Sequence, residues 1–177
     1  MGLKVIIPVA GVGSRLRPHT HTAPKVMVQV AGKPMLGHIL DELSNYDVDE
    51  IIMVIGHMGE AIKSYVKETY DFNFRFVTQN ELKGLGHAIW MTGEHIQDDS
   101  PLLIILGDTI FAANFKSIIG SDSNWIGVKE VEDPRRFGVV QLEGDRIKAM
   151  VEKPQNPPTN LAIVGIYYFT NGRSLFN

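Results

Sequence analysis

The 177-residue sequence contains no cysteine, which excludes a disulfide framework and a thiolate metal site. It has no excess of positive charge either, because 17 Lys and Arg residues stand against 20 Asp and Glu residues. The apolar run at residues 5–9 is too short for the core of a signal peptide or for a membrane span. We therefore expect a cytoplasmic protein that binds neither nucleic acid nor membranes.

Apolar segments alternate with amphipathic ones along the first part of the chain. Strands are predicted where β-branched residues gather between Gly, Asp or Pro, at 4–9, 50–56, 73–78, 102–106, 125–131, 139–142, 146–152 and 161–169. Helices are predicted where apolar residues recur at helical spacing, at 34–46, 59–70 and 85–96. This order predicts a Rossmann-like three-layer α/β/α fold with a mostly parallel mixed sheet, to which the last strands add in antiparallel orientation.

A glycine-rich loop, AGVGSR at residues 10–15, follows the first predicted strand. It is not a dinucleotide fingerprint, because Leu16 stands where the third glycine is required, and it is not a Walker loop, because no lysine follows Gly13. Arg15, with Lys25 ten residues further on, nevertheless suits an anion. A tight turn would explain the glycines alone, but not two cations in one loop. The loop therefore predicts a phosphate-binding site.

Other polar residues follow predicted strands. Asp108 comes directly after the apolar strand 102–106, where open α/β sheets bind ligands, and it could hold a divalent cation or merely cap the next segment. Gln79 ends a strand before a turn that opens a helix. His87, in that helix, is interpreted as a packing or capping residue without a catalytic role. Glu152 and Lys153 alone would be solvated surface residues.

These motifs together resemble those of a known enzyme family. The stretch AGVGSRLRP…PKVMVQVAGKPML is similar to the N-terminal signature of the sugar-1-phosphate nucleotidylyltransferases, the nucleotide-sugar pyrophosphorylases. GLGHAI at residues 84–89 is similar to the form in UDP-glucose pyrophosphorylases, and LGD at 106–108 and VEKP at 151–154 resemble further family motifs. The resemblance implies an enzyme that joins a nucleoside triphosphate, with UTP or dTTP favoured, to a sugar 1-phosphate, with glucose 1-phosphate favoured. The products would be a nucleotide-diphosphate sugar and pyrophosphate.

The resemblance also implies roles for individual residues. The catalytic residues would be Arg15, Lys25 and Asp108, and Asp108 would also bind Mg²⁺. The nucleotide would be bound by Ala10, Gly11, Val12, Gly13, Ser14, Gln79 and Gly84, with Gln79 on the base edge. The sugar phosphate would be bound by Gly138, Glu152, Lys153 and Gly165.

The resemblance further predicts one nucleotidyltransferase domain over residues 1–177. Residues 1–110 would form its nucleotide-binding half and residues 111–177 its sugar-phosphate-binding half. Family members normally continue into a region that carries a second metal-binding carboxylate, so we expect this sequence to correspond to their N-terminal part. Two alternatives stay open: a non-catalytic nucleotide-binding or regulatory module, and a relative that uses mannose 1-phosphate, N-acetylglucosamine 1-phosphate or phosphocholine. The sequence leaves assembly into a homo-oligomer open.

Overall fold

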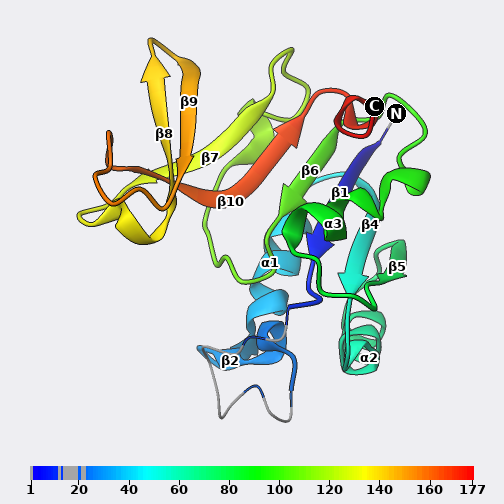
Figure 1. The fold of residues 1–177 in the computed structure, drawn as a ribbon. Coiled ribbons are helices and arrows are strands. Elements are labelled where there is room, and N and C mark those ends of the chain that lie inside the picture. The colour runs from blue at the N-terminus through cyan, green and yellow to red at the C-terminus, as the bar shows by residue number, and fades with distance from the viewer. Residues whose placement is uncertain (1, 12, 14–19, 21–22) are drawn as a thin grey trace.

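The computed structural model describes residues 2–11, 13, 20 and 23–177. Its main feature is an eight-stranded mixed sheet with the order β5-β4-β1-β6-β10-β8-β9, in which β7 pairs with β10 (Figure 1). The strands are β1 (Leu3–Pro8), β4 (Val48–Ile55), β5 (Phe74–Thr78), β6 (Leu102–Ile105), β7 (Trp125–Glu130), β8 (Gly138–Glu143), β9 (Arg146–Glu152) and β10 (Leu161–Phe169). The pairs β1–β4, β1–β6 and β4–β5 are parallel, and all pairs of β7 to β10 are antiparallel.

Helices cover both faces of the parallel part of the sheet. α1 (Met35–Leu43) and α2 (Gly59–Thr69) pack on the face that carries Val5, Ile7 and Met53. α3 (Leu85–Trp90) packs on the opposite face, with Ile6 and Ile104. Successive strand residues point to opposite faces, so each buried strand supplies both cores. The predicted three-layer α/β/α fold is confirmed.

The prediction of one helix over residues 85–96 is wrong in its length. α3 ends at Trp90, and a separate 3₁₀ turn covers Gly93–His95. Thr92 explains the break, because its backbone N–H and its hydroxyl both donate to the Ile89 carbonyl, at 2.9 and 2.7 Å. A threonine that bonds back to the preceding turn competes with continued helix, and the glycine after it adds no helix propensity.

A small hairpin lies outside the main sheet, between β2 (Gln29–Val30) and β3 (Lys33–Pro34). Its turn residues, Ala31 and Gly32, both have left-handed φ values, 50° and 81°, as a two-residue hairpin turn requires. The 3₁₀ turn Lys25–Met27 precedes this hairpin. No helix in the described ranges has the length and apolar character needed to cross a membrane.

The long strand β10 joins the parallel part of the sheet to the β8–β9 hairpin. Its residues 166–169 pair with β6, while Ala162 pairs with Val139 of β8. β7 runs along the other edge of β10, with a register shift between Ile163 and Tyr167. Gly165 lies at this shift with a φ of 79°, and its carbonyl accepts a hydrogen bond from the Leu106 N–H at 2.9 Å. β10 therefore changes partner at Gly165.

Candidate active site

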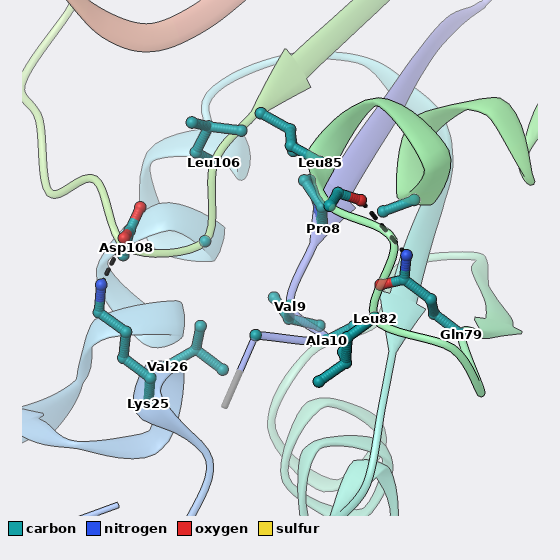
Figure 2. A pocket seen from close by; sticks show the side chains of 14 residues that line it. Pro8, Val9, Ala10, Lys25, Val26, Gln79, Leu82, Leu85, Leu106 and Asp108 are labelled. Atoms are coloured by element: carbon teal, nitrogen blue, oxygen red, sulfur yellow. Dashed lines mark hydrogen bonds and ion pairs between the residues drawn. The ribbon is translucent and has the colours of Figure 1, made fainter. Parts of the chain in front are cut away.

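A cavity of about 390 Å³ opens at the carboxyl ends of β1 and β6 (Figure 2). β1 lies between β4 and β6 in the sheet. The chain after β1 leads to strands on the β4 side, and the chain after β6 leads to strands on the other side, so the two connections leave in opposite directions. Open α/β sheets bind ligands in such a crevice. The lining comes from four segments, residues 8–11, 25–26, 79–88 and 106–108.

An ion pair between Lys25 and Asp108 lies at the edge of this cavity. Lys25 is held there by the buried neighbour Val26, in the 3₁₀ turn Lys25–Met27. Asp108 follows β6 through Gly107, where an added Cβ would lie 2.7 Å from the side chain of Val9. The two charged side chains remain 29% and 46% exposed, so an anion could approach Lys25 and a cation could approach Asp108.

Gly13 packs directly against Lys25. Its φ is 66°, and an added Cβ would lie 2.7 Å from the Cβ of Lys25. The hydroxyl of the buried residue Thr20 donates to the Gly13 carbonyl at 2.9 Å. Gly11 lines the cavity with open space where its Cβ would be, and Ala10 lines it as well. The left-handed φ and the contact with Lys25 thus require a glycine at position 13, whereas Gly11 leaves open space beside the cavity.

Three residues of the predicted loop, Val12, Ser14 and Arg15, lie outside the described residues. Their assigned roles therefore stay predictions.

Gln79 forms the far wall of the cavity. Its backbone N–H donates to the Ile55 carbonyl at 2.8 Å, which extends the β4–β5 pairing by one residue. Its buried side chain donates through Nε2 to the carbonyl of Gly84, at 3.3 Å, and lies 2.9 Å from Nδ1 of His87. Gly84 caps α3 with a φ of 91°, where an added Cβ would meet nothing. The structure therefore brings Gln79 and Gly84 together, and it adds His87 to them.

The apolar part of the cavity wall was not predicted from the sequence. It consists of Pro8, Val9, Val26, Leu82, Leu85, Ala88, Leu106 and Gly107. Leu82 and Leu85 are 60% and 42% exposed, although leucine side chains gain free energy on burial. Exposed leucines beside a glutamine amide can contact a flat ring whose edge carries polar groups. The sequence signal for them is a pair of leucines within a glycine-flanked turn.

The predicted sugar-phosphate residues form a second group. Gly138 lies opposite Glu152 in the β8–β9 pairing, and an added Cβ at Gly138 would lie 3.0 Å from Glu152 Oε2. Lys153 has a left-handed φ of 43°, its N–H donates to the Phe137 carbonyl, and its Nζ lies 2.5 Å from Glu152 Oε1. None of these three residues lines the cavity at Asp108.

Gly165 and Tyr167 lie between the two groups. Gly165 packs on Leu106, since an added Cβ would lie 2.7 Å from that side chain. Burial, together with the negative charge of Glu152, raises the pKa of Tyr167 above its ordinary value. Tyr167 also lines an apolar cavity of about 470 Å³ that shares Leu85 with the first one.

Asp108 is the predicted metal ligand. No cluster of three or more His, Asp or Glu residues suited to a metal occurs in the ranges that the structure describes. Mg²⁺ commonly keeps several waters and uses only one or two carboxylates together with substrate phosphates. The partly exposed carboxylate of Asp108 fits a cation that arrives with phosphate, rather than one held in an all-protein cage.

The chain is also similar to known proteins. Residues 4–177 match the family model described as Nucleotidyl transferase. In Haloferax volcanii, the chain is 35% identical to the UTP–glucose-1-phosphate uridylyltransferase AglF, over 95% of this chain and 72% of AglF. It is 33% identical to the low-salt glycan biosynthesis nucleotidyltransferase Agl11 of the same organism, over 95% of this chain and 49% of Agl11. The bifunctional protein GlmU of Methanocaldococcus jannaschii is 37% identical, over 94% of this chain and 40% of GlmU.

Solved structures show the same fold. A UDP-glucose pyrophosphorylase complexed with UDP-glucose superposes with a TM-score of 0.85 and 28% identity, over 96% of this chain and 76% of that one. A Bacillus anthracis protein in complex with a sucrose, assigned as a glucose-1-phosphate thymidylyltransferase, gives a TM-score of 0.88 and 27% identity, over 98% of this chain and 73% of that one.

Proposed function

Because the chain belongs to the nucleotidyl transferase family, we propose that it transfers a nucleotidyl group from a nucleoside triphosphate to a sugar 1-phosphate. UTP or dTTP is the favoured nucleotide and glucose 1-phosphate the favoured sugar phosphate. The names of AglF and of the superposed UDP-glucose pyrophosphorylase support this choice. Residues 1–110 would form the nucleotide-binding half and residues 111–177 the sugar-phosphate-binding half of a cytoplasmic enzyme.

The observation that carries the proposal is the pairing of Lys25 with Asp108 at the edge of a cavity that also holds the Gln79 amide. A base would lie between Leu82 and Leu85 with its edge on Gln79. The triphosphate would then extend past Ala10 and Gly11 toward Lys25. A lysine and an aspartate that neutralise each other in the free protein can exchange partners for a phosphate and a cation without leaving either charge unpaired.

The reaction needs no covalent protein nucleophile. An oxygen of the sugar 1-phosphate attacks the α-phosphorus in line, the bond to the β-phosphate oxygen breaks, and pyrophosphate leaves. Because both substrates are anionic, the protein's tasks are positioning and charge neutralisation. Lys25 would bridge the α-phosphate and the attacking phosphate. Lys153 would anchor the attacking phosphate, and Glu152 would bind sugar hydroxyls.

Mg²⁺, when bound by Asp108 and substrate phosphates, would supply charge compensation at the α-phosphate. Arg15 and the backbone at 11–14 would bind the departing pyrophosphate. This role of Arg15 rests on the family resemblance.

The test is pyrophosphate release with UTP or dTTP, glucose 1-phosphate and Mg²⁺, measured on a chain that also carries the region in which family members have the second metal-binding carboxylate. We expect release that needs both substrates. Nucleotide binding without release, also with mannose 1-phosphate, N-acetylglucosamine 1-phosphate and phosphocholine, would favour the non-catalytic binding module instead. Absence of nucleotide binding would contradict the proposal altogether.

A further inference from the structure

The orientation of the Gln79 amide is fixed by its two neighbours. Its Nε2 lies 3.3 Å from the Gly84 carbonyl oxygen and 2.9 Å from Nδ1 of His87. A backbone carbonyl only accepts hydrogen bonds, so the amide nitrogen, and not the amide oxygen, must face Gly84. Nδ1 of His87 is then the second acceptor, which places the proton of the neutral imidazole on Nε2.

The second acceptor is itself held in place. His87 lies in the first turn of α3, next to the buried residue Ala88. Its ring stacks on that of Trp90, with centroids 6.1 Å apart and planes 24° apart. The helix therefore holds Nδ1 at a set position relative to the end of β5.

This arrangement decides which atom of Gln79 faces a ligand. Both N–H groups of the amide are directed at Gly84 and His87. The amide oxygen takes part in no hydrogen bond within the described part of the chain, and Figure 2 shows it turned toward the interior of the cavity. Gln79 thus offers the cavity an acceptor and no donor.

We propose that His87 is a positioning residue that makes Gln79 select the base of the nucleotide. The proposal rests on the proposed function. A fixed acceptor favours a base with a ring N–H at its pairing edge, which uracil, thymine and guanine have. With the base in the same position, cytosine and adenine present a ring nitrogen lone pair there, so two acceptors would face each other, and the base would have to shift to offer its amino group instead. A buried polar group left without a partner is the strong form of discrimination in binding sites.

The test measures the dissociation constants of UTP and CTP by calorimetry, on the full chain with Mg²⁺. We expect the wild-type protein to prefer UTP by roughly tenfold or more, the ratio that one hydrogen bond against one unpaired acceptor gives. His87→Leu removes one of the two acceptors that orient the amide and leaves the Gly84 carbonyl as the other, so it should lower the ratio. His87→Asn places an amide oxygen near the position of Nδ1 and should restore the preference. His95→Leu, in the 3₁₀ turn after α3, is the matched control and should keep the wild-type ratio.

The ratio of the two dissociation constants distinguishes a positioning role from a packing role, because a loss of packing weakens the binding of UTP and CTP equally. A wild-type ratio in His87→Leu would overturn the role of His87 while leaving the proposed function intact. Failure of the wild-type protein to bind any triphosphate would overturn both. The nitrogen spectrum of the wild-type imidazole at alkaline pH is an independent measurement. The Nε2–H tautomer supports the inference, and the Nδ1–H tautomer contradicts it.

Discussion

At the scale of single residues, the Lys25–Asp108 pair separates function from stability. Both side chains are partly exposed, so the pair contributes at most about 1 kcal/mol to folding. Its value would lie in the transition state, where one charged contact is worth roughly 2–4 kcal/mol. Residues that matter little for folding and much for turnover identify a site better than buried ones do.

We predict that Lys25→Ala lowers turnover at least about 100-fold and changes the free energy of unfolding by less than about 1 kcal/mol. Lys33→Ala is the control, because Lys33 forms a similarly exposed ion pair with Asp41, away from the cavity. Turnover and urea unfolding of both variants check this prediction. Near-normal turnover of Lys25→Ala would contradict the assigned role. Arg15→Ala should lose turnover to the same extent.

The two loop glycines should respond differently to alanine. Gly13→Ala forces a left-handed φ on a residue with a Cβ and also crowds that Cβ against Lys25, so it should destabilise the protein by about 2–5 kcal/mol and weaken UTP binding. A Cβ at Gly11 meets open space, so the free energy of unfolding of Gly11→Ala should lie within about 0.5 kcal/mol of the wild-type value. This variant should lose only affinity for UTP. Urea unfolding and calorimetry measure the two effects. Equal stability of the two variants would refute the distinction.

Part of the site follows from the sequence alone. Asp108 was predicted because it follows a strand of the parallel sheet, and the carboxyl ends of such strands face the ligand crevice. The role of Gln79 was predicted from the resemblance of its stretch to a family motif. The contact of Lys25 with Asp108 was not, because it joins positions 83 residues apart. His87 was assigned to packing, since its partner depends on how the Gly84 turn directs α3 toward the end of β5.

At the scale of elements, the change of partner along β10 depends on a glycine, Gly165. Gly165 combines a left-handed φ with a close approach to Leu106, so two separate costs oppose a Cβ there. Leu106 also lines the cavity, which couples the bend in β10 to the site.

Gly165→Ala should therefore destabilise the protein by more than Gly144→Ala. Gly144, in the β8–β9 turn, has a φ of 62° and open space around it, so its replacement costs only the left-handed conformation, about 1–2 kcal/mol. Gly165→Ala adds overpacking against Leu106, about 1–3 kcal/mol more. Denaturant unfolding of both variants gives the difference. Equal losses would mean that Leu106 moves aside without cost.

The predicted ends of an element agree with the structure where the run of patterned residues in the sequence is long. The strand predicted at 161–169 is β10, and that at 146–152 is β9. The helix predicted over 85–96 was too long, because periodicity does not register the bonds that Thr92 makes to Ile89. The β2–β3 hairpin escaped prediction, because strands of two residues carry no periodicity.

At the scale of the whole molecule, ligand binding should raise thermal stability. UTP at 100 times its dissociation constant stabilises the native state by about 2.7 kcal/mol. For a chain of this size that corresponds to a rise in Tm of roughly 5–10 °C. Scanning calorimetry with and without UTP and Mg²⁺ measures it. Lys25→Ala at the same UTP concentration should show a smaller rise, and an unchanged wild-type Tm would contradict the proposed nucleotide site.

The fold class was predictable because alternating strands and helices admit few arrangements. The order of strands was less accessible, since β6 pairs with β1 and with β10, segments far from it in the chain. Nothing in the local sequence of β10 predicts that one edge of this strand pairs first with β8 and then with β6.

The double pairing of β10 has a consequence for synthesis on the ribosome. β1, β4, β5 and β6 emerge first, and the edge of β6 stays open until residues 166–169 follow about sixty residues later. That edge belongs to a strand of four buried aliphatic residues, Leu102–Ile105, the type of segment that pairs with other chains when exposed. The nascent chain is therefore most prone to aggregation after β6 has emerged and before β10 does, and slow translation between the two would lower the yield of folded protein.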